Sequence, residues 1–228
     1  MNQLIKIFCE IDDYCKDYEL SCRKFLIDDN LKSVISKSSM TLSEIMTILV
    51  YFHQSRFRDF KSYYKTMILG FLKSYFPKSV SYNRFVELMR YSLIPLLLYT
   101  IQYGFGKCDG LNFIDSTPIK SCKFQRRYSH KTMKQFAAVG KSSTGWFYGL
   151  KLHLVINGNG EILSFCITSG NVSDIDEEVI EKLTKNIFGK LIGDKGYIFR
   201  KIFEKLFEKH ITMITKIRNN MKNKLVML

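Results

Sequence analysis

The chain has 228 residues, of which 46% are hydrophobic and 14% aromatic, so we expect one or two folded domains with a sizeable core. Thirty-five Lys and Arg residues against 21 Asp and Glu residues give a formal charge of +14. This balance favours a nucleic acid or an anionic surface as the partner. The most apolar run, residues 93–99, is too short to span a bilayer and is expected to be buried core. Glu10 follows the start too closely for a signal peptide, so neither a membrane segment nor export is expected.

Residues 1–105 show a helical periodicity. Apolar side chains recur at steps of three and four between Leu4 and Tyr18, which predicts an amphipathic helix. Thr41 and Glu44 have the spacing of a capping box at the start of a second helix, and Ser81 is a candidate N-cap for a third. The sequence therefore predicts an all-helical N-terminal domain over residues 1–105.

The period changes to two after Gly106, which predicts strands. Between Trp146 and Ile156, apolar residues alternate with a second set that contains Lys151 and His153. We expect the apolar set to face the core and Lys151 and His153 to lie on the opposite, polar face. Residues 157–160 form a turn, and a second strand over 161–168 completes a predicted β-hairpin.

The remaining elements predict a mixed α/β domain over residues 106–228. A helix is expected after capping residues in 171–174, followed by a strand over 190–194, a helix over 197–210 and a strand over 211–217.

Two aspartates stand where short apolar strands are predicted to end. Asp115 closes residues 111–115, and Asp194 closes residues 190–194. If the strands are neighbours, the carboxylates form a site for Mg²⁺, which prefers oxygen ligands and needs few from the protein. Two Mg²⁺ ions about 4 Å apart would activate an attacking hydroxyl and stabilise the leaving oxygen of a phosphoryl displacement, given a third acidic group. The alternative is structural, because a lone Asp at a strand end is usually a turn former or a helix cap.

The stretch from Ser116 to Gly160 holds eight Lys or Arg residues and no Asp or Glu. Such a surface neutralises phosphates without reading sequence, although a solvated basic loop is the alternative. His153, which shares a strand face with Lys151, and Lys195, which follows Asp194, are further candidates for contact with DNA phosphate. The alternative for both is an ordinary polar position that faces solvent. The candidate DNA-binding residues are Lys120, Lys123, Arg126, Arg127, Lys131, Lys134, Lys141, Lys151, His153 and Lys195.

Several segments together resemble bacterial DDE transposases, and most closely insertion-sequence family 982. The segments in the second half are 113–118 (FIDSTP), 140–153 (GKSSTGWFYGLKLH) and 193–197 (GDKGY), and those in the first half are 42–47, 51–55 and 81–85. The resemblance implies an RNase H-like catalytic domain, with Asp115 and Asp194 as the first two catalytic and metal-binding acids. It further implies Mg²⁺ or Mn²⁺ at a two-metal site, and a bacterial, cytoplasmic and nucleoid-associated protein.

The resemblance also implies the partners. They are double-stranded DNA, as terminal inverted repeats and as target, and other copies of the chain in a homo-oligomer on DNA. The helical domain over 1–105 is then expected to bind the element ends.

The family pattern places a catalytic Glu on a helix after the last strand, beyond a segment that resembles residues 215–223. Only residues 224–228 follow that segment here, and Glu204 and Glu208 precede the last predicted strand. We therefore expect a catalytic domain truncated before its third acid, with impaired or absent activity. Three hypotheses remain: an active Mg²⁺-dependent transposase, an inactive DNA-binding remnant that inhibits an intact transposase, and a non-enzymatic basic regulator whose helical domain reads DNA.

Overall fold

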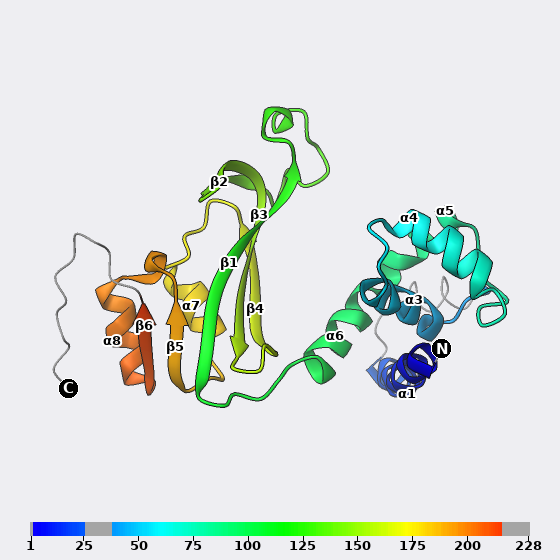
Figure 1. Cartoon of the computed structure of the whole chain (residues 1–228), viewed down its shortest axis with the longest axis horizontal. Helices are drawn as coiled ribbons and strands as arrows, with labels where there is room; N and C mark the ends of the chain where they lie inside the picture. Colours follow the sequence, from blue (N-terminus) through cyan, green and yellow to red (C-terminus); the bar gives the residue numbers. More distant parts are fainter. Residues whose placement is uncertain (1, 26–37, 216–228) are drawn as a thin grey trace. The chain divides into compact units, whose positions relative to one another are not determined.

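The computed structural model describes residues 2–25 and 38–215 (Figure 1). The chain divides into two compact units, Met1–Tyr103 and Gly104–Leu228. Within the described ranges, no helix combines the length and the hydropathy needed to cross a membrane.

The described part of the first unit is built from helices. They are α1 (Asn2–Phe25), α3 (Leu42–Gln54), α4 (Phe60–Tyr63), the π-helical η1 (Tyr64–Phe71), α5 (Tyr82–Met89), the 3₁₀ turn η2 (Arg90–Ser92) and α6 (Leu93–Tyr103). The predicted capping box is confirmed, because Thr41 Oγ1 accepts from the Glu44 amide at 3.1 Å and the Thr41 amide donates to Glu44 Oε2 at 2.8 Å. The predicted cap at Ser81 is also confirmed, since its side chain accepts from the Arg84 amide.

Aromatic side chains fill much of the core of this unit. Tyr63, Tyr64 and Phe85 are fully buried, and the rings of Tyr64 and Phe85 lie 4.5 Å apart. The prediction that residues 93–99 are buried core is wrong in large part, because Leu93 and Ile94 of α6 are 67% and 57% exposed.

The second unit contains a six-stranded mixed sheet. Its strands are β1 (Leu111–Cys122), β2 (Ala138–Ser142), β3 (Gly145–Asn157), β4 (Ile162–Ser169), β5 (Gly189–Gly193) and β6 (Ile211–Thr215). The order is β2-β3-β1-β5-β6, and β4 also pairs with β3. The strand β3 is antiparallel to both β1 and β4, which confirms the predicted hairpin, whereas β5 runs parallel to β1 and β6 parallel to β5.

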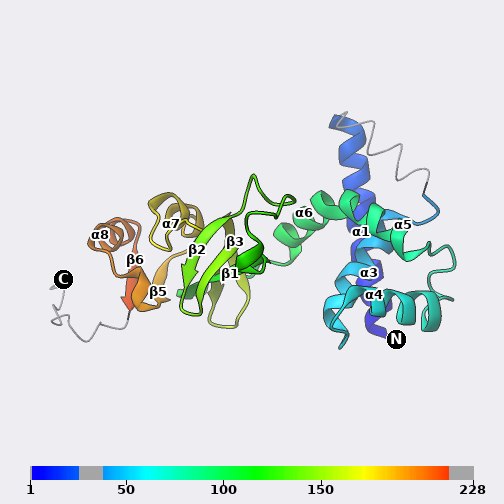
Figure 2. The same ribbon diagram turned by 90° about the horizontal axis from the view of Figure 1, so that it is seen from above.

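Two helices, α7 (Glu177–Leu183) and α8 (Arg200–Glu208), lie on the same face of the sheet (Figure 2). Their apolar side chains form one buried cluster with the inward side chains of the strands. The cluster includes Ile114, Val155, Val179, Leu183, Leu191, Ile202, Leu206 and Met213. The expected caps in 171–174 are wrong, because Asp176 caps α7 by accepting from the amides of Glu178 and Val179.

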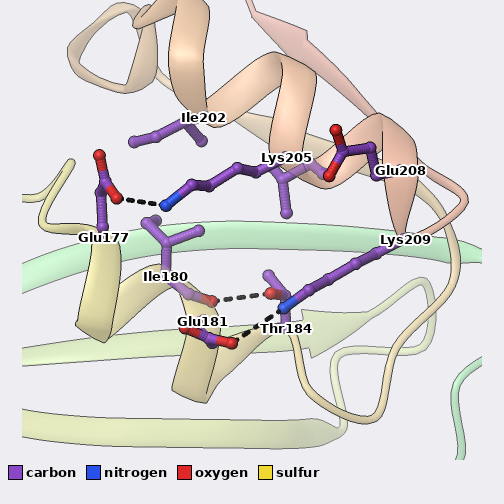
Figure 3. Close-up of a pocket in the computed structure, with 9 residues that line it drawn as sticks. Glu177, Ile180, Glu181, Thr184, Ile202, Lys205, Glu208 and Lys209 are labelled. Atoms are coloured by element: carbon purple, nitrogen blue, oxygen red, sulfur yellow. Dashed lines mark hydrogen bonds and ion pairs between the residues drawn. The ribbon is translucent and has the colours of Figure 1, made fainter.

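Ion pairs join α7 to α8 above a shallow hollow between the two helices (Figure 3). Glu177 pairs with Lys205, and Glu181 pairs with Lys209 at 3.4 Å. Because the acidic groups that line the hollow pair with lysines or lie open to solvent, we interpret it as packing between helices and not as a reactive site.

The strand β3 turns its polar residues inward, opposite to the prediction. Phe147, Lys151, His153 and Val155 are buried on the inner face. The alternating residues from Leu150 to Ile156 are only partly buried on the other face. That other face carries exposed apolar side chains of several strands. They include Leu111, Phe113, Ile119, Ile167 and Ile214.

The strand β1 extends well beyond its parallel neighbour. Its register with β5 runs from Leu111 opposite Lys190 to Ile114 opposite Gly193. From Asp115 to Cys122, β1 pairs with β3 alone. The prediction that Asp115 ends a strand is therefore wrong, although the parallel pairing does end one residue before it.

Candidate functional site

The sheet brings Asp115 and Asp194 together. Ile114 and Gly193 form the last registered pair of β1 and β5, and the two aspartates follow them directly. Both side chains are exposed to solvent. The predicted adjacency of the two strands is thus confirmed, and the two carboxylates stand at the carboxyl end of β5 and at the same level of β1.

Each aspartate is oriented by its own following amide. Asp115 Oδ1 accepts from the Ser116 amide at 2.8 Å, and Asp194 Oδ1 accepts from the Lys195 amide at 2.6 Å. In the second case the bond starts the 3₁₀ turn η4 (Lys195–Tyr197), for which Asp194 is the N-cap. These local bonds fix the carboxylates near the backbone and leave both side chains at the surface.

This donor set fits a Mg²⁺ ion held by one or two carboxylates, with water and substrate phosphate oxygens in the other positions. It does not contain a third acid. Across residues 2–25 and 38–215, no three Asp, Glu, His or Cys side chains come together in a group that could hold a metal ion. Glu204 and Glu208 lie on α8, as expected from their place before the last strand. The predicted loss of a third acid concerns residues 216–228, which lie outside the described residues.

A polar cluster lies on the inner face of the sheet, behind Asp115. We call it the Asp174 cluster, and its members are Ser116, Lys151, His153, Thr168, Asp174 and Tyr197. The Oδ1 atom of Asp174 contacts three members of this cluster. Ser116 Oγ donates to Asp174 Oδ1 at 2.7 Å, Lys151 Nζ donates to it at 3.0 Å, and His153 Nδ1 lies 3.9 Å away. His153 Nε2 is 2.9 Å from Thr168 Oγ1.

Burial perturbs the titration of two members of this cluster. The pKa of Tyr197 is raised, first by burial and then by the carboxylates of Asp174, Asp115 and Asp194. Ser116 lowers the pKa of Tyr197, although the buried Tyr197 hydroxyl forms no hydrogen bond with any described residue. Burial also lowers the pKa of His153, against the raising effect of Asp174. His153 is therefore neutral at neutral pH.

The structure separates the candidate DNA-binding residues into two groups. Six of them are exposed and form no ion pair with a carboxylate of the described chain: Lys120, Lys123, Arg126, Lys131, Lys134 and Lys141. We call these six lysines and arginines the basic surface. Beside it, Arg127 lies 4.2 Å from the ring centroids of both Phe124 and Tyr128. Lys141 lies 5.6 Å from the ring of Trp146, which is 59% exposed.

Lys151 and His153 do not belong to that surface. Lys151 is 8% exposed and His153 is fully buried, so the prediction that they lie on an outward polar face is wrong. The physical reason is that Asp174 supplies the counterion that a buried ammonium requires. Lys195 lies in η4, half-buried, next to Asp194.

Sequence reasoning misses Asp174, Ser116 and Tyr197 as site residues. The position of Asp174 before a predicted helix indicates only a cap, since Asp near a helix start usually has that role. A signal is nevertheless present in β3, where Lys151 and His153 alternate in phase with Phe147 and Val155. Two polar residues on an apolar face require a buried partner, and Asp174 supplies it.

Comparisons with known proteins concern mainly the second unit. Residues 105–228 match a family model described as "Transposase DDE domain". A comparison with curated proteins gives no match. Among solved structures, the chain is similar to a piggyBac transposase, from a cryo-EM structure of its synaptic complex with hairpin DNA, with 12% identity and a TM-score of 0.36. The match covers 52% of this chain and 25% of that chain, and at this score it supports no conclusion about the fold.

The matched segment contains both aspartates, the basic surface and the whole sheet, and it makes up more than half of the chain. The chain belongs to the family of proteins with a transposase DDE domain.

Proposed function

We propose that the protein is a DNA transposase of an insertion sequence, similar to family 982, which cleaves and joins DNA at element ends with Mg²⁺ or Mn²⁺. Asp115 and Asp194 are its first two catalytic acids. The observation that carries the proposal is their placement directly after the last paired residues of two neighbouring parallel strands.

The strand order supports an RNase H-like catalytic domain. Three antiparallel strands, β1, β3 and β4, are followed by α7, β5, α8 and β6, and both later strands run parallel to β1. This arrangement places β1 and β5 side by side in the middle of the sheet, where the two carboxylates emerge. Such a position suits ligands, which in open α/β sheets bind outside the carboxyl ends of strands.

A bound Mg²⁺ would supply charge stabilisation for the phosphoryl group and activation of the attacking hydroxyl. Asp115 and Asp194 would hold the ion, with water and phosphate oxygens of DNA in its other positions. The local bonds from the Ser116 and Lys195 amides orient the carboxylates before the metal arrives, which lowers the cost of ordering them.

The basic surface supports double-stranded DNA as the substrate. Six exposed cations without carboxylate partners among the described residues gather on β1, β2 and the segment between them. Contacts of this kind position the DNA backbone and carry no sequence information. We therefore assign recognition of the terminal inverted repeats to the helical unit Met1–Tyr103, and we propose that copies of the chain assemble on the two ends.

A second candidate function is DNA binding without cleavage, for example inhibition of an intact transposase. It is favoured by one observation: no third acidic side chain joins Asp115 and Asp194 among the described residues. A site with two carboxylates holds one metal ion more readily than two.

The test is a cleavage assay with the full chain, Mg²⁺ or Mn²⁺, and duplex DNA that carries the inverted repeats flanking the coding sequence. We expect metal-dependent nicks at the repeat ends and a loss of at least about a hundredfold in rate for Asp115→Asn and Asp194→Asn. Glu208→Gln removes an exposed carboxylate on α8 and is the matched control. Repeat-specific binding without nicks in either metal would support the second candidate, and binding indifferent to the repeats would contradict both.

A further inference from the structure

We propose that the Asp174 cluster positions Asp115 relative to Asp194, with Asp174 and Lys151 as its positioning residues. The inference rests on the proposed function, because it concerns the site at which the two aspartates would hold a metal ion. It adds residues that act through Asp115 and Asp194 without touching the metal or the DNA.

The backbone alone leaves the two aspartates without a direct link. The pairing of β1 with β5 ends at Ile114 and Gly193. Beyond that pair, β1 continues against β3, and the other chain segment turns into η4. The spacing of the two carboxylates therefore depends on what holds the segments that follow them.

The Asp174 cluster binds the segment after Asp115 directly, and Tyr197 packs beneath the segment that leads to Asp194. Ser116, the residue after Asp115, donates to Asp174 at 2.7 Å. Tyr197, three residues after Asp194, is 2% exposed and packs its ring on Gly193, so that a Cβ at Gly193 would lie 3.1 Å from Tyr197 Cδ2.

Lys151 anchors the cluster to the centre of the sheet. Its ammonium group donates to Asp174 at 3.0 Å and to the Val172 carbonyl at 2.8 Å. These two hydrogen bonds connect the loop after β4 to β3. Removal of the counterion of a buried cation is strongly destabilising. Asp174 therefore has a fixed partner on β3 and transmits that fixed position to Ser116 on β1.

The same arrangement explains why Ser116 is half-buried on the face opposite to Asp115. Successive residues of a strand point to opposite faces, so a bond from Ser116 fixes the backbone without occupying the space around Asp115. Partners that orient metal ligands from behind typically change metal affinity by about 10- to 100-fold when they are removed.

The experiment measures Mn²⁺ binding to the full chain by isothermal titration calorimetry, with thermal melts in a chelator alongside. Because Asp174→Ala alone leaves a buried ammonium unpaired, the main variant is the double substitution Asp174→Ala with Lys151→Met, which leaves no unpaired charge. Ser116→Ala removes only the hydrogen bond from Ser116 to Asp174. We expect the double variant to fold and to bind Mn²⁺ about tenfold more weakly or worse, and Ser116→Ala to lie between it and the native chain.

Asp176→Ala is the control for stability. It removes the cap of α7 in the same loop without removing a hydrogen bond of the cluster, so its melting temperature should fall while its Mn²⁺ affinity stays unchanged. Native Mn²⁺ affinity in the double variant, or an equal loss in Asp176→Ala, would overturn the inference. If Asp115→Asn binds Mn²⁺ as the native chain does, or the native chain binds none, the proposed metal site itself is wrong and the inference falls with it.

Discussion

Ile114 of β1 and Gly193 of β5 are the last residues that pair across the centre of the sheet, and each is followed by an aspartate. The contact between the two strands is tight at this point. A Cβ placed on Gly193 would lie 2.8 Å from Met213 Cε and 3.0 Å from Ile114 Cγ2. The absence of a side chain at residue 193 therefore allows the close approach of β1, β5 and η4 at the candidate site.

We expect Gly193→Ala to lower the free energy of unfolding by about 1–3 kcal/mol, because overpacking displaces neighbouring side chains. The same displacement should weaken Mn²⁺ binding. Gly196→Ala is the matched control on the other side of Asp194, since no atom lies within 4 Å of a Cβ placed there. Urea denaturation followed by circular dichroism measures both variants, and equal stabilities for the two would contradict the close packing at Gly193.

The basic surface predicts a strong dependence of DNA binding on salt. Replacement of Lys131 and Lys134 by Gln should weaken binding to all duplexes alike. The slope of log K against log salt concentration should become shallower by about 0.9 for each DNA phosphate that the variant no longer neutralises. Lys182→Gln on α7 is the control, because Lys182 pairs with Glu178 at 2.7 Å. An unchanged slope in the first variant, measured by fluorescence anisotropy, would remove these two residues from the interface.

The lowered pKa of His153 predicts a stability that depends on pH. Below the ordinary His pKa of about 6.5, residue 153 binds a proton in the unfolded chain but stays neutral when buried in the folded chain. The stability of the folded chain therefore falls as the pH drops from about 6.5 to the lowered pKa of His153. The charges that act on His153 are Asp174 and Asp176, which raise its pKa, and Lys151, which lowers it. Melting curves from pH 7.5 to 5 should show a smaller loss in His153→Gln than in the native chain. An equal loss of melting temperature in both proteins would show that His153 does not contribute to the pH dependence of stability.

The capping box of α3 is expected to contribute measurably to the stability of the first unit. Thr41→Ala removes the acceptor for the Glu44 amide and should cost about 1 kcal/mol of stability. Thr41→Ser keeps the acceptor and should cost less. Chemical denaturation distinguishes the two, and an equal loss would assign the effect to packing and not to the cap.

Local signals in the sequence predict much of the structure. The caps at Thr41 and Ser81 and the hairpin of β3 and β4 depend on residues close together in the chain, and the structure confirms them. The neighbouring positions of Asp115 and Asp194 also follow from two short apolar strands, although β1 extends to Cys122 and does not end at Asp115.

The predictions that fail depend on contacts distant in the chain. The inner face of β3 is predicted wrongly because polar Lys151 and His153 are expected to face solvent, and their partner Asp174 lies more than twenty residues away. The strand β2 is not predicted, since its five residues gain their place only by pairing with the start of β3. Tyr197 and Ser116 likewise have a role only once the sheet has brought their segments together.

Because β1 is longer than β5, part of β1 forms an open edge of the sheet. From Ser116 to Cys122, the side of β1 that faces away from β3 has no strand partner among the described residues. An open strand edge invites pairing with another sheet, and natural proteins oppose this with proline and charged residues. Pro118 has no amide hydrogen to donate, and Lys120 carries an exposed charge. These two residues oppose pairing of this edge with a foreign strand, so the edge next to Asp115 stays unpaired.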